Sequence, residues 1–173
     1  MKLVILDRDG VINHDSDQYI KSPEEWKPIP GSLAAIARLN QAGYRVVVAS
    51  NQSGVGRGLF ETDTLMAIHD KMIKALAQVG GRIDAIFFCP HTNADNCDCR
   101  KPKPGMILEA AAELGINLKK SFMVGDRKSF EPDVAEAQDL ARQLDDELVR
   151  QGPSAITPLV DSRVPLARMV ELG

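Results

Sequence analysis

The chain has 173 residues, of which 44% are hydrophobic and 26% charged, and its formal net charge is −3. This length suits one globular domain, so we expect residues 1–173 to form a single unit. The weak negative charge gives no electrostatic reason to expect nucleic acid or an anionic membrane as a partner. No apolar run approaches the roughly 20 residues of a membrane span. The first strand pattern leaves no room for a secretory signal. We therefore expect a cytoplasmic, monomeric protein that acts on a small molecule.

Short apolar runs alternate with longer segments of helical periodicity. The runs are rich in Val, Ile and Phe and apolar on both faces, as in parallel strands covered by helices; they span residues 2–6, 44–50, 83–89 and 121–125. Helices are predicted over 32–42, with Ser32 as N-cap and Gly43 as the stop, over 61–79 and over 105–114. His69, in the second helix, is expected at the surface or its boundary. The alternation predicts an α/β fold, a three-layer doubly wound parallel sheet.

The pattern changes in the C-terminal segment, residues 128–173. A long charged helix is predicted over 132–151, an edge strand within 154–161, whose proline excludes a central position, and a short helix over 164–172. Three interpretations of this divergent segment stay open. It covers the sheet edge, it forms an oligomer contact, or it weakens metal binding.

Polar residues follow each of the four predicted strands at its carboxyl end. They are Asp7 and Asp9, then Ser50 to Ser53, then Cys89 and His91, and last Gly125 and Asp126. Ligands of doubly wound sheets bind beyond the carboxyl ends of the strands, so these groups are expected to converge at one edge. Asp7 and Asp9 repel each other unless a cation or a shared proton offsets their charge.

This constellation resembles the haloacid dehalogenase superfamily of phosphohydrolases. DRDG (7–10) matches its first motif, Ser50 its second, a downstream lysine its third and GD (125–126) its fourth. The resemblance implies that Asp7 is the nucleophile that forms an aspartyl-phosphate and that Asp9 is the general acid/base. It also implies a Mg²⁺ site formed by the Asp7 carboxylate, the Asp9 backbone carbonyl and Asp126.

The remaining implied roles concern the charge of the phosphoryl group and the substrate. Ser50 and Asn51 are expected to hydrogen-bond the phosphoryl oxygens, and Lys101 to neutralise them, with Lys103 as a rival. Further substrate contacts are expected from Gln52, Ser53, Arg57, Arg100, Arg127, Lys128, Asp15 and Gln18. For Arg57 a solvated loop arginine is an open alternative, and for Asp15 and Gln18 a polar surface turn.

All three cysteines lie in the segment CPHTNADNCDC (89–99), which favours a metal or reactive-thiol cluster over a disulfide framework. Cys89, His91, Cys97 and Cys99 supply three sulfurs and one imidazole, a full tetrahedral set for Zn²⁺. Four protein ligands leave no open position, so this zinc is expected to be structural and to present Arg100 and Lys101 to the phosphate. The alternative is a loop with free thiols and a chance histidine.

The segment 89–99, called the zinc loop below, restricts the resemblance to one subgroup of the superfamily. The connections between motifs are too short for a separate lid domain, so the protein is expected to be capless. Within capless phosphatases, the loop resembles that of the D,D-heptose 1,7-bisphosphate phosphatases and of the related histidinol-phosphate phosphatases. The basic segment NQSGVGRG (51–58) favours the heptose enzymes, and with them removal of the C7 phosphate in nucleotide-heptose and lipopolysaccharide precursor synthesis. The alternatives are histidinol phosphate as substrate, or a catalytically impaired, zinc-stabilised binding protein.

The fourth motif departs from the family pattern, which has a second acidic residue four or five positions after Asp126. Phe130 and Glu131 stand there, followed by Pro132, and Glu131 can ligate Mg²⁺ directly or through water. If it does, Glu131→Ala raises the Mg²⁺ concentration needed for half-maximal activity. Steady-state assays across a Mg²⁺ titration check this, and an unchanged requirement would make Glu131 a bystander.

Overall fold

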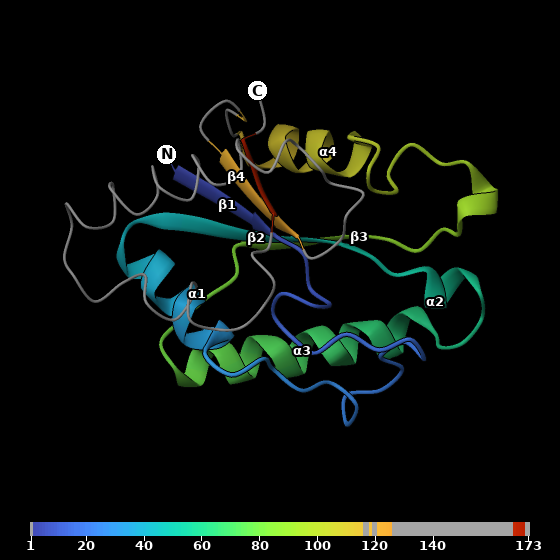
Figure 1. Ribbon diagram of the computed structural model, residues 1–173, viewed down its shortest axis with the longest axis horizontal. Helices are drawn as coiled ribbons and strands as arrows, with labels where there is room; N and C mark the ends of the chain where they lie inside the picture. Colours follow the sequence, from blue (N-terminus) through green and yellow to red (C-terminus); the bar gives the residue numbers. More distant parts are fainter. Residues whose placement is uncertain (1, 116–117, 119–120, 126–167, 172–173) are drawn as a thin grey trace.

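A five-stranded sheet lies at the centre of the computed structural model, which describes residues 2–115, 118, 121–125 and 168–171 (Figure 1). The strands are β1 (Lys2–Leu6), β2 (Tyr44–Asn51), β3 (Ala85–Cys89), β4 (Ser121–Gly125) and β5 (Arg168–Glu171). The helices are α1 (Ser32–Gln41), α2 (Ser53–Gly56), α3 (Thr62–Gln78) and α4 (Gly105–Leu114), with a 3₁₀ turn at Asn93–Asp95. In the order β3-β2-β1-β4-β5, the first four strands are parallel, which confirms the predicted sheet.

The sheet ends in an antiparallel strand that the sequence analysis did not predict. β5 pairs with β4, so the prediction of a helix over 164–172 is wrong at residues 168–171. The open edge of β4 offers unpaired N–H and C=O groups, and pairing with them satisfies the backbone of a segment too short for a stable helix. The helix predicted over 132–151 and the strand within 154–161 lie outside the described residues.

Alternate side chains of the central strands enter two hydrophobic cores, because successive residues of a strand point to opposite faces. Val4 and Leu6 of β1 pack in the core that contains Ile36 of α1 and Met72 of α3. Their neighbours Leu3 and Ile5 pack in the core that contains Met106 and Ile107 of α4. Figure 1 shows α1 and α3 on one side of the sheet and α4 on the other. The three-layer prediction is confirmed.

The helices begin and end close to their predicted positions. The N-cap of α1 is Gly31 rather than Ser32, so that detail of the prediction is wrong. The Ser32 hydroxyl instead donates to the Ile12 carbonyl at 2.7 Å, which ties the start of α1 to the loop after β1. Gly43 has a φ of 84° just past the helix end, the left-handed conformation expected of a terminating glycine. Within the described part of the chain, no helix is both long and apolar enough to span a bilayer.

His69 of α3 is buried, with only 4% of its surface exposed, so the expectation of a surface or boundary position is wrong. Its ring lies edge-on to that of Phe88, with 6.1 Å between the centroids. Its Nε2 has no hydrogen-bond partner among the described residues. Burial, together with the positive charge of Arg8, lowers the pKa of His69 from 6.5 to about 4, while Asp9 opposes that shift. The imidazole is therefore neutral in the folded protein at neutral pH.

This burial predicts an acid-sensitive contribution to stability. The unfolded chain binds a proton at His69 below about pH 6.5, whereas the folded protein does so only near pH 4. The wild type should therefore lose about 2 kcal/mol of unfolding free energy between pH 7.5 and 5 relative to His69→Gln. Urea unfolding of both proteins at several pH values measures this difference. Parallel stability curves for the two proteins would contradict the prediction.

Candidate active site

A tight turn follows β1 and holds two aspartates at the carboxyl edge of the sheet. The Asp7 N–H donates to the Val124 carbonyl of β4 at 2.8 Å, so β1 and β4 stay joined up to this point. The Arg8 carbonyl accepts the N–H of Ile12 at 2.8 Å and that of Asn13 at 3.2 Å, which closes the turn. The chain therefore reverses within a few residues of Asp7.

Each of the two aspartates is paired with a cation. Lys101 Nζ lies 2.6 Å from Asp7 Oδ2, and Arg8 Nη2 lies 2.8 Å from Asp9 Oδ1. The lysine and arginine side chains are only 2% and 0% exposed. The repulsion expected between the two carboxylates is thus offset by the protein's own charges. Arg8 had no role in the sequence analysis, because nothing in the sequence shows that this side chain turns back onto its neighbour.

The Asp9 carboxylate lies in a network of amide donors. Gln52 Nε2 donates to Asp9 Oδ2 at 2.8 Å and lies 2.7 Å from Ser50 Oγ. Gln52 Oε1 accepts from Arg8 Nη2 at 3.2 Å. Gln52 was expected to contact substrate, but its side chain is buried and bonded to these protein groups. Gln52 therefore links Asp9 to Ser50.

Asn13 and Trp26 complete the network from the loop after β1. Asn13 Nδ2 donates to Asp9 Oδ1 at 2.9 Å, and Trp26 Nε1 donates to Asn13 Oδ1 at 3.0 Å. Both side chains are buried. Neither was predicted from the sequence, where the amide-containing Asn13 and the single tryptophan give no sign that they meet.

Asn51 fixes the backbone of Lys101. Its side-chain amide donates to the Lys101 carbonyl and accepts the Lys101 N–H, both at 3.0 Å. Lys103, the rival candidate, is exposed and donates to the Cys97 carbonyl at 2.9 Å and to Asn96 Oδ1 at 3.1 Å. Lys101, and not Lys103, therefore lies at Asp7.

The four predicted zinc ligands converge at the end of β3. Cys89 Sγ lies 3.6 Å from Cys97 Sγ and 3.2 Å from Cys99 Sγ, and His91 Nδ1 lies 3.3 Å from Cys99 Sγ. All four donor atoms lie within 4.8 Å of one another. Zinc bonds of about 2.3 Å to sulfur and 2.0 Å to nitrogen set tetrahedral ligand atoms about 3.5–3.8 Å apart, so this set fits Zn²⁺. Burial raises the pKa of the Cys89 thiol to about 12, so a bound metal must displace its proton.

The zinc loop packs closely against its neighbours, and glycines make this possible. A Cβ on Gly56 of α2 would lie 2.5 Å from the Pro90 carbonyl oxygen, and one on Gly105 of α4 would lie 2.3 Å from that of Asp98. Both glycine N–H groups donate to these same carbonyls, at 3.0 and 3.1 Å. The loop is therefore fixed to α2 and to the start of α4.

Two predicted substrate-binding arginines lie in different surroundings. Arg100 Nε donates to Asn93 Oδ1 at 2.6 Å and its Nη1 to the His91 carbonyl at 3.1 Å, so the zinc loop sets its position. Arg57, at the end of α2, is exposed, while Ser53 at the start of that helix is buried.

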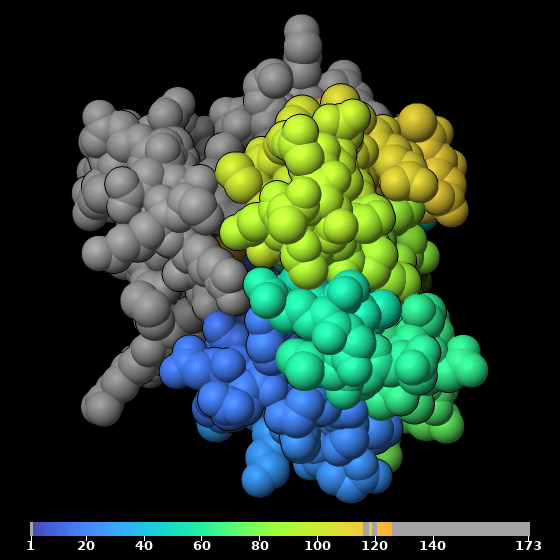
Figure 2. Space-filling view, turned by 90° about the vertical axis from the view of Figure 1, so that its right-hand side faces the viewer, coloured from blue at the N-terminus to red at the C-terminus, as the bar shows by residue number. Residues whose placement is uncertain are grey.

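The short helix α2 is absent from the sequence prediction, because four residues are too few to show helical periodicity. Figure 2 shows the loop after β1, the α2 segment and the zinc loop side by side on one face.

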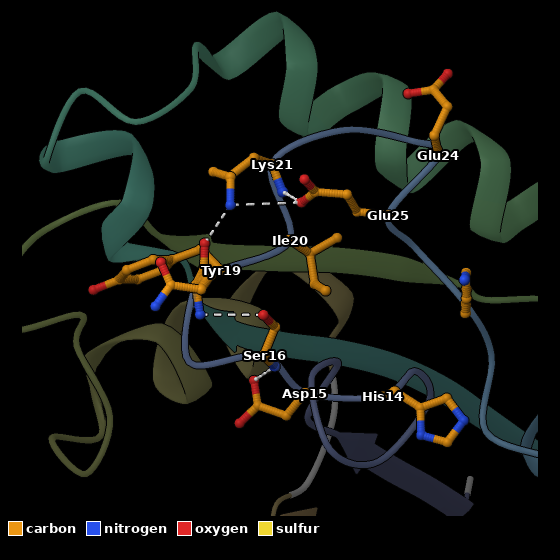
Figure 3. Close-up of a pocket in the computed structure, with 10 residues that line it drawn as sticks. His14, Asp15, Ser16, Tyr19, Ile20, Lys21, Glu24 and Glu25 are labelled. Atoms are coloured by element: carbon orange, nitrogen blue, oxygen red, sulfur yellow. Dashed lines mark hydrogen bonds and ion pairs between the residues drawn. The ribbon is translucent and has the colours of Figure 1, made fainter.

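The loop after β1 also lines a pocket of about 480 Å³ (Figure 3). Asp15 and Gln18, both predicted to contact substrate, belong to its lining. Asp15 Oδ1 accepts the Ser16 N–H at 2.8 Å, and the Gln18 carbonyl accepts from Lys21 Nζ at 2.6 Å. Asp7, Asp9, Ser50 and Lys101 are not among the residues that line it. The structure thus groups Asp15 with Gln18, but does not join them to the paired aspartates.

Several predicted residues lie beyond Gly125, where β4 ends beside β1. Asp126, Arg127, Lys128 and Glu131 lie outside the described residues. The donors described for a Mg²⁺ ion are the Asp7 carboxylate and the Asp9 backbone carbonyl. Both are hard oxygen donors of the kind that Mg²⁺ requires, so the described part of the expected ligand set fits this ion.

A family model for haloacid dehalogenase-like hydrolases matches residues 5–129. The chain belongs to this family. The match ends two residues after the point, near residue 127, where the sequence pattern departs from the family. The predicted family is confirmed, and residues 130–173 lie beyond the matched region.

Several heptose bisphosphate phosphatases are similar to this chain over most of its length. The D-glycero-β-D-manno-heptose-1,7-bisphosphate 7-phosphatase of Bordetella bronchiseptica is 61% identical over 126 residues, which cover 73% of this chain and 70% of that protein. A crystal structure of D,D-heptose 1,7-bisphosphate phosphatase from the same species, complexed with magnesium and phosphate, matches with a TM-score of 0.67 and 63% identity. That match covers 68% of this chain and 66% of the crystallised one. The corresponding enzyme from Burkholderia thailandensis matches at 41% identity and a TM-score of 0.54, over 95% of this chain and 88% of its own.

The cysteine cluster yields a metal-removal prediction. Cys97→Ser removes one thiolate from the tetrahedral set, so bound zinc should fall and the melting temperature should drop by several degrees. Metal analysis of the purified protein and a thermal melt measure the two effects. The matched control is Asp98→Asn in the same loop, since the Asp98 side chain is 99% exposed and is not in the cluster. Unchanged zinc content in Cys97→Ser would exclude the four-ligand site.

Proposed function

We propose that this protein is a Mg²⁺-dependent phosphatase that removes the 7-phosphate of D-glycero-D-manno-heptose 1,7-bisphosphate and leaves heptose 1-phosphate. The observation that carries the proposal is the pairing of Asp7 with Lys101 at 2.6 Å, beside the Asp9–Arg8 pair, at the carboxyl edge of the sheet. A nucleophilic carboxylate, a cation for the phosphoryl oxygens and a second carboxylate for proton transfer are what phosphoryl transfer needs. The names of the similar proteins support the sugar bisphosphate as substrate.

In the first half-reaction, an Asp7 carboxylate oxygen attacks phosphorus. The bond between phosphorus and the C7 oxygen of the sugar breaks, and Asp9 gives its proton to that oxygen. We assign Lys101 to neutralise the charge of the transferring group and Ser50 and Asn51 to hydrogen-bond it. The product on the protein is an aspartyl-phosphate at Asp7.

In the second half-reaction, Asp9 takes a proton from a water molecule. The water oxygen bonds to phosphorus, and the bond between phosphorus and Asp7 breaks, which frees phosphate and restores the Asp7 carboxylate. Asp7, the Asp9 backbone carbonyl and Asp126 would hold Mg²⁺, with Glu131 as a further ligand. When bound, this ion neutralises part of the phosphoryl charge.

The second phosphate of the substrate calls for cations outside the catalytic pair. We assign Arg57, Arg100 and Arg127 to it, and the loop of Asp15 and Gln18 to the sugar. Arg100 suits this role because the zinc loop orients it one residue from Lys101. We further propose that residues 1–173 form one capless domain that works as a monomer in the cytoplasm, within nucleotide-heptose synthesis. Light scattering during size-exclusion chromatography tests the monomer.

The decisive assay compares phosphate release from both anomers of heptose 1,7-bisphosphate and from histidinol phosphate, with Mg²⁺. The expected result is one phosphate per heptose bisphosphate, fastest with the β anomer, with the remaining phosphate at C1 by ³¹P NMR. Asp7→Asn should lower kcat at least about 10³-fold, because it removes the nucleophile.

Asp70→Asn is the control for this assay, because it makes the same charge change at an exposed position of α3, away from the proposed site. It should keep wild-type activity. A folded, zinc-loaded wild type that releases no phosphate from the bisphosphate would refute the proposed function. Asp7→Asn with more than about a tenth of the activity would refute Asp7 as nucleophile.

A further inference from the structure

A buried arginine stands between the two catalytic aspartates, and the proposed mechanism gives it no task. The Arg8 side chain is 0% exposed. Burying a guanidinium group is costly in free energy unless the group is paired and hydrogen-bonded, as for other buried ions. Its partner is the adjacent residue, Asp9, whose side chain is only 19% exposed. Stability alone does not account for this pair, because well-packed apolar residues can often replace a buried ion pair without loss of stability.

The contacts of Arg8 fix the orientation of one carboxylate. Its Nε donates to Asp9 Oδ1 at 2.9 Å and its Nη2 to Asp9 Oδ2 at 3.0 Å, so both carboxylate oxygens are held in one plane. The same Nη2 donates to Gln52 Oε1 at 3.2 Å, and Gln52 in turn donates to Asp9. A bidentate guanidinium contact fixes the direction of the carboxylate and also balances its charge. An ammonium group balances the charge but does not fix the direction.

We propose that Arg8 is a positioning residue that holds the Asp9 carboxylate in the orientation required for proton transfer. The inference rests on the proposed role of Asp9 as general acid/base. Proton transfer needs an Asp9 oxygen within hydrogen-bond reach of the leaving oxygen. Without the guanidinium, only the single amide contacts of Asn13 and Gln52 hold the Asp9 carboxylate. A misplacement of about 1 Å can cost about 10²-fold in rate.

Two substrates separate this role from a purely structural one. The sugar oxygen of the heptose bisphosphate leaves as a poor anion and needs a proton from Asp9. The p-nitrophenolate ion leaves p-nitrophenyl phosphate without one. For both substrates kcat/KM covers the steps up to the first irreversible one, transfer of the phosphoryl group to Asp7. A variant that disturbs only Asp9 should slow the sugar substrate alone, whereas a variant that disturbs the whole site should slow both.

The test variant is Arg8→Lys, which keeps the charge and loses the two-pronged contact. We expect kcat/KM for heptose 1,7-bisphosphate to fall about 10²-fold and that for p-nitrophenyl phosphate by less than about 3-fold, with KM nearly unchanged. Arg45→Lys is the matched control. Arg45 Nε lies 3.3 Å from Asp84 Oδ1, a partly buried arginine–aspartate pair at the opposite end of β2, and this variant should leave both activities unchanged.

Gln52→Met, made in parallel, keeps the buried volume and removes one arm of the network, so the test does not depend on the folding of Arg8→Lys. Like Arg8→Lys, it should lower kcat/KM for heptose 1,7-bisphosphate more than kcat/KM for p-nitrophenyl phosphate. Equal losses on both substrates, or no loss on either, would overturn the positioning role of Arg8.

Asp9→Asn separates this inference from the proposed function. If Asp9→Asn keeps its activity on the sugar substrate, the general acid/base assignment fails and the Arg8 inference fails with it. If Asp9→Asn loses that activity while Arg8→Lys shows no selectivity between substrates, only the inference on Arg8 fails.

Discussion

Two carboxylates one residue apart, at the buried end of a strand, require positive charge close by, and much of the structure around the site supplies it. Lys101 arrives from the far side of the zinc loop to meet Asp7, and Arg8 turns back from between the aspartates to meet Asp9. Such pairs do not by themselves stabilise a fold, because the cost of dehydrating the ions offsets their attraction. Removal of one partner is nevertheless costly, about 3–5 kcal/mol, because the other charge stays buried. The two pairs therefore supply the positive charge that two carboxylates this close to each other require.

The zinc loop follows from the same requirement. Lys101 is two residues from Cys99 and is held by Asn51 through both of its backbone polar groups. The loop from His91 to Asp98 has few apolar side chains, and backbone contacts to Gly56 and Gly105 fix its position. A zinc ion on the Cys/His cluster would fix it further. The candidate zinc site and Lys101 thus belong to one loop: its four ligand residues converge at one end, and Lys101 meets Asp7 at the other.

The sequence predicts the parts of this protein that depend on local pattern. The four parallel strands, three of the helices and the Cys/His cluster follow from residue types and spacing, and the resemblance to the family singles out Asp7 and Asp9. What it does not predict depends on contacts between distant segments. Arg8, Asn13 and Gln52 look like ordinary polar residues until the turn after β1 and the end of β2 bring them together around Asp9. β5 forms because β4 has a free edge, which the sequence of residues 168–171 does not show. The spacing of His69 does indicate burial, since it lies four residues after Leu65 and three before Met72 on the buried face of α3. The polarity of its side chain favoured a surface position instead.

The network around Asp9 also explains how one loop serves two purposes. Trp26 bonds Asn13, Asn13 bonds Asp9, and Lys71 of α3 donates to the Trp26 carbonyl at 3.2 Å with its Nζ 5.9 Å from the centre of the indole. These buried contacts anchor the base of the loop after β1 to the Asp9 carboxylate and to α3. The tip of the same loop, where Asp15 and Gln18 line the pocket, is exposed and bonded mainly within itself. Because the anchoring residues and the pocket residues are different, the pocket wall can change its chemistry without moving Asp9.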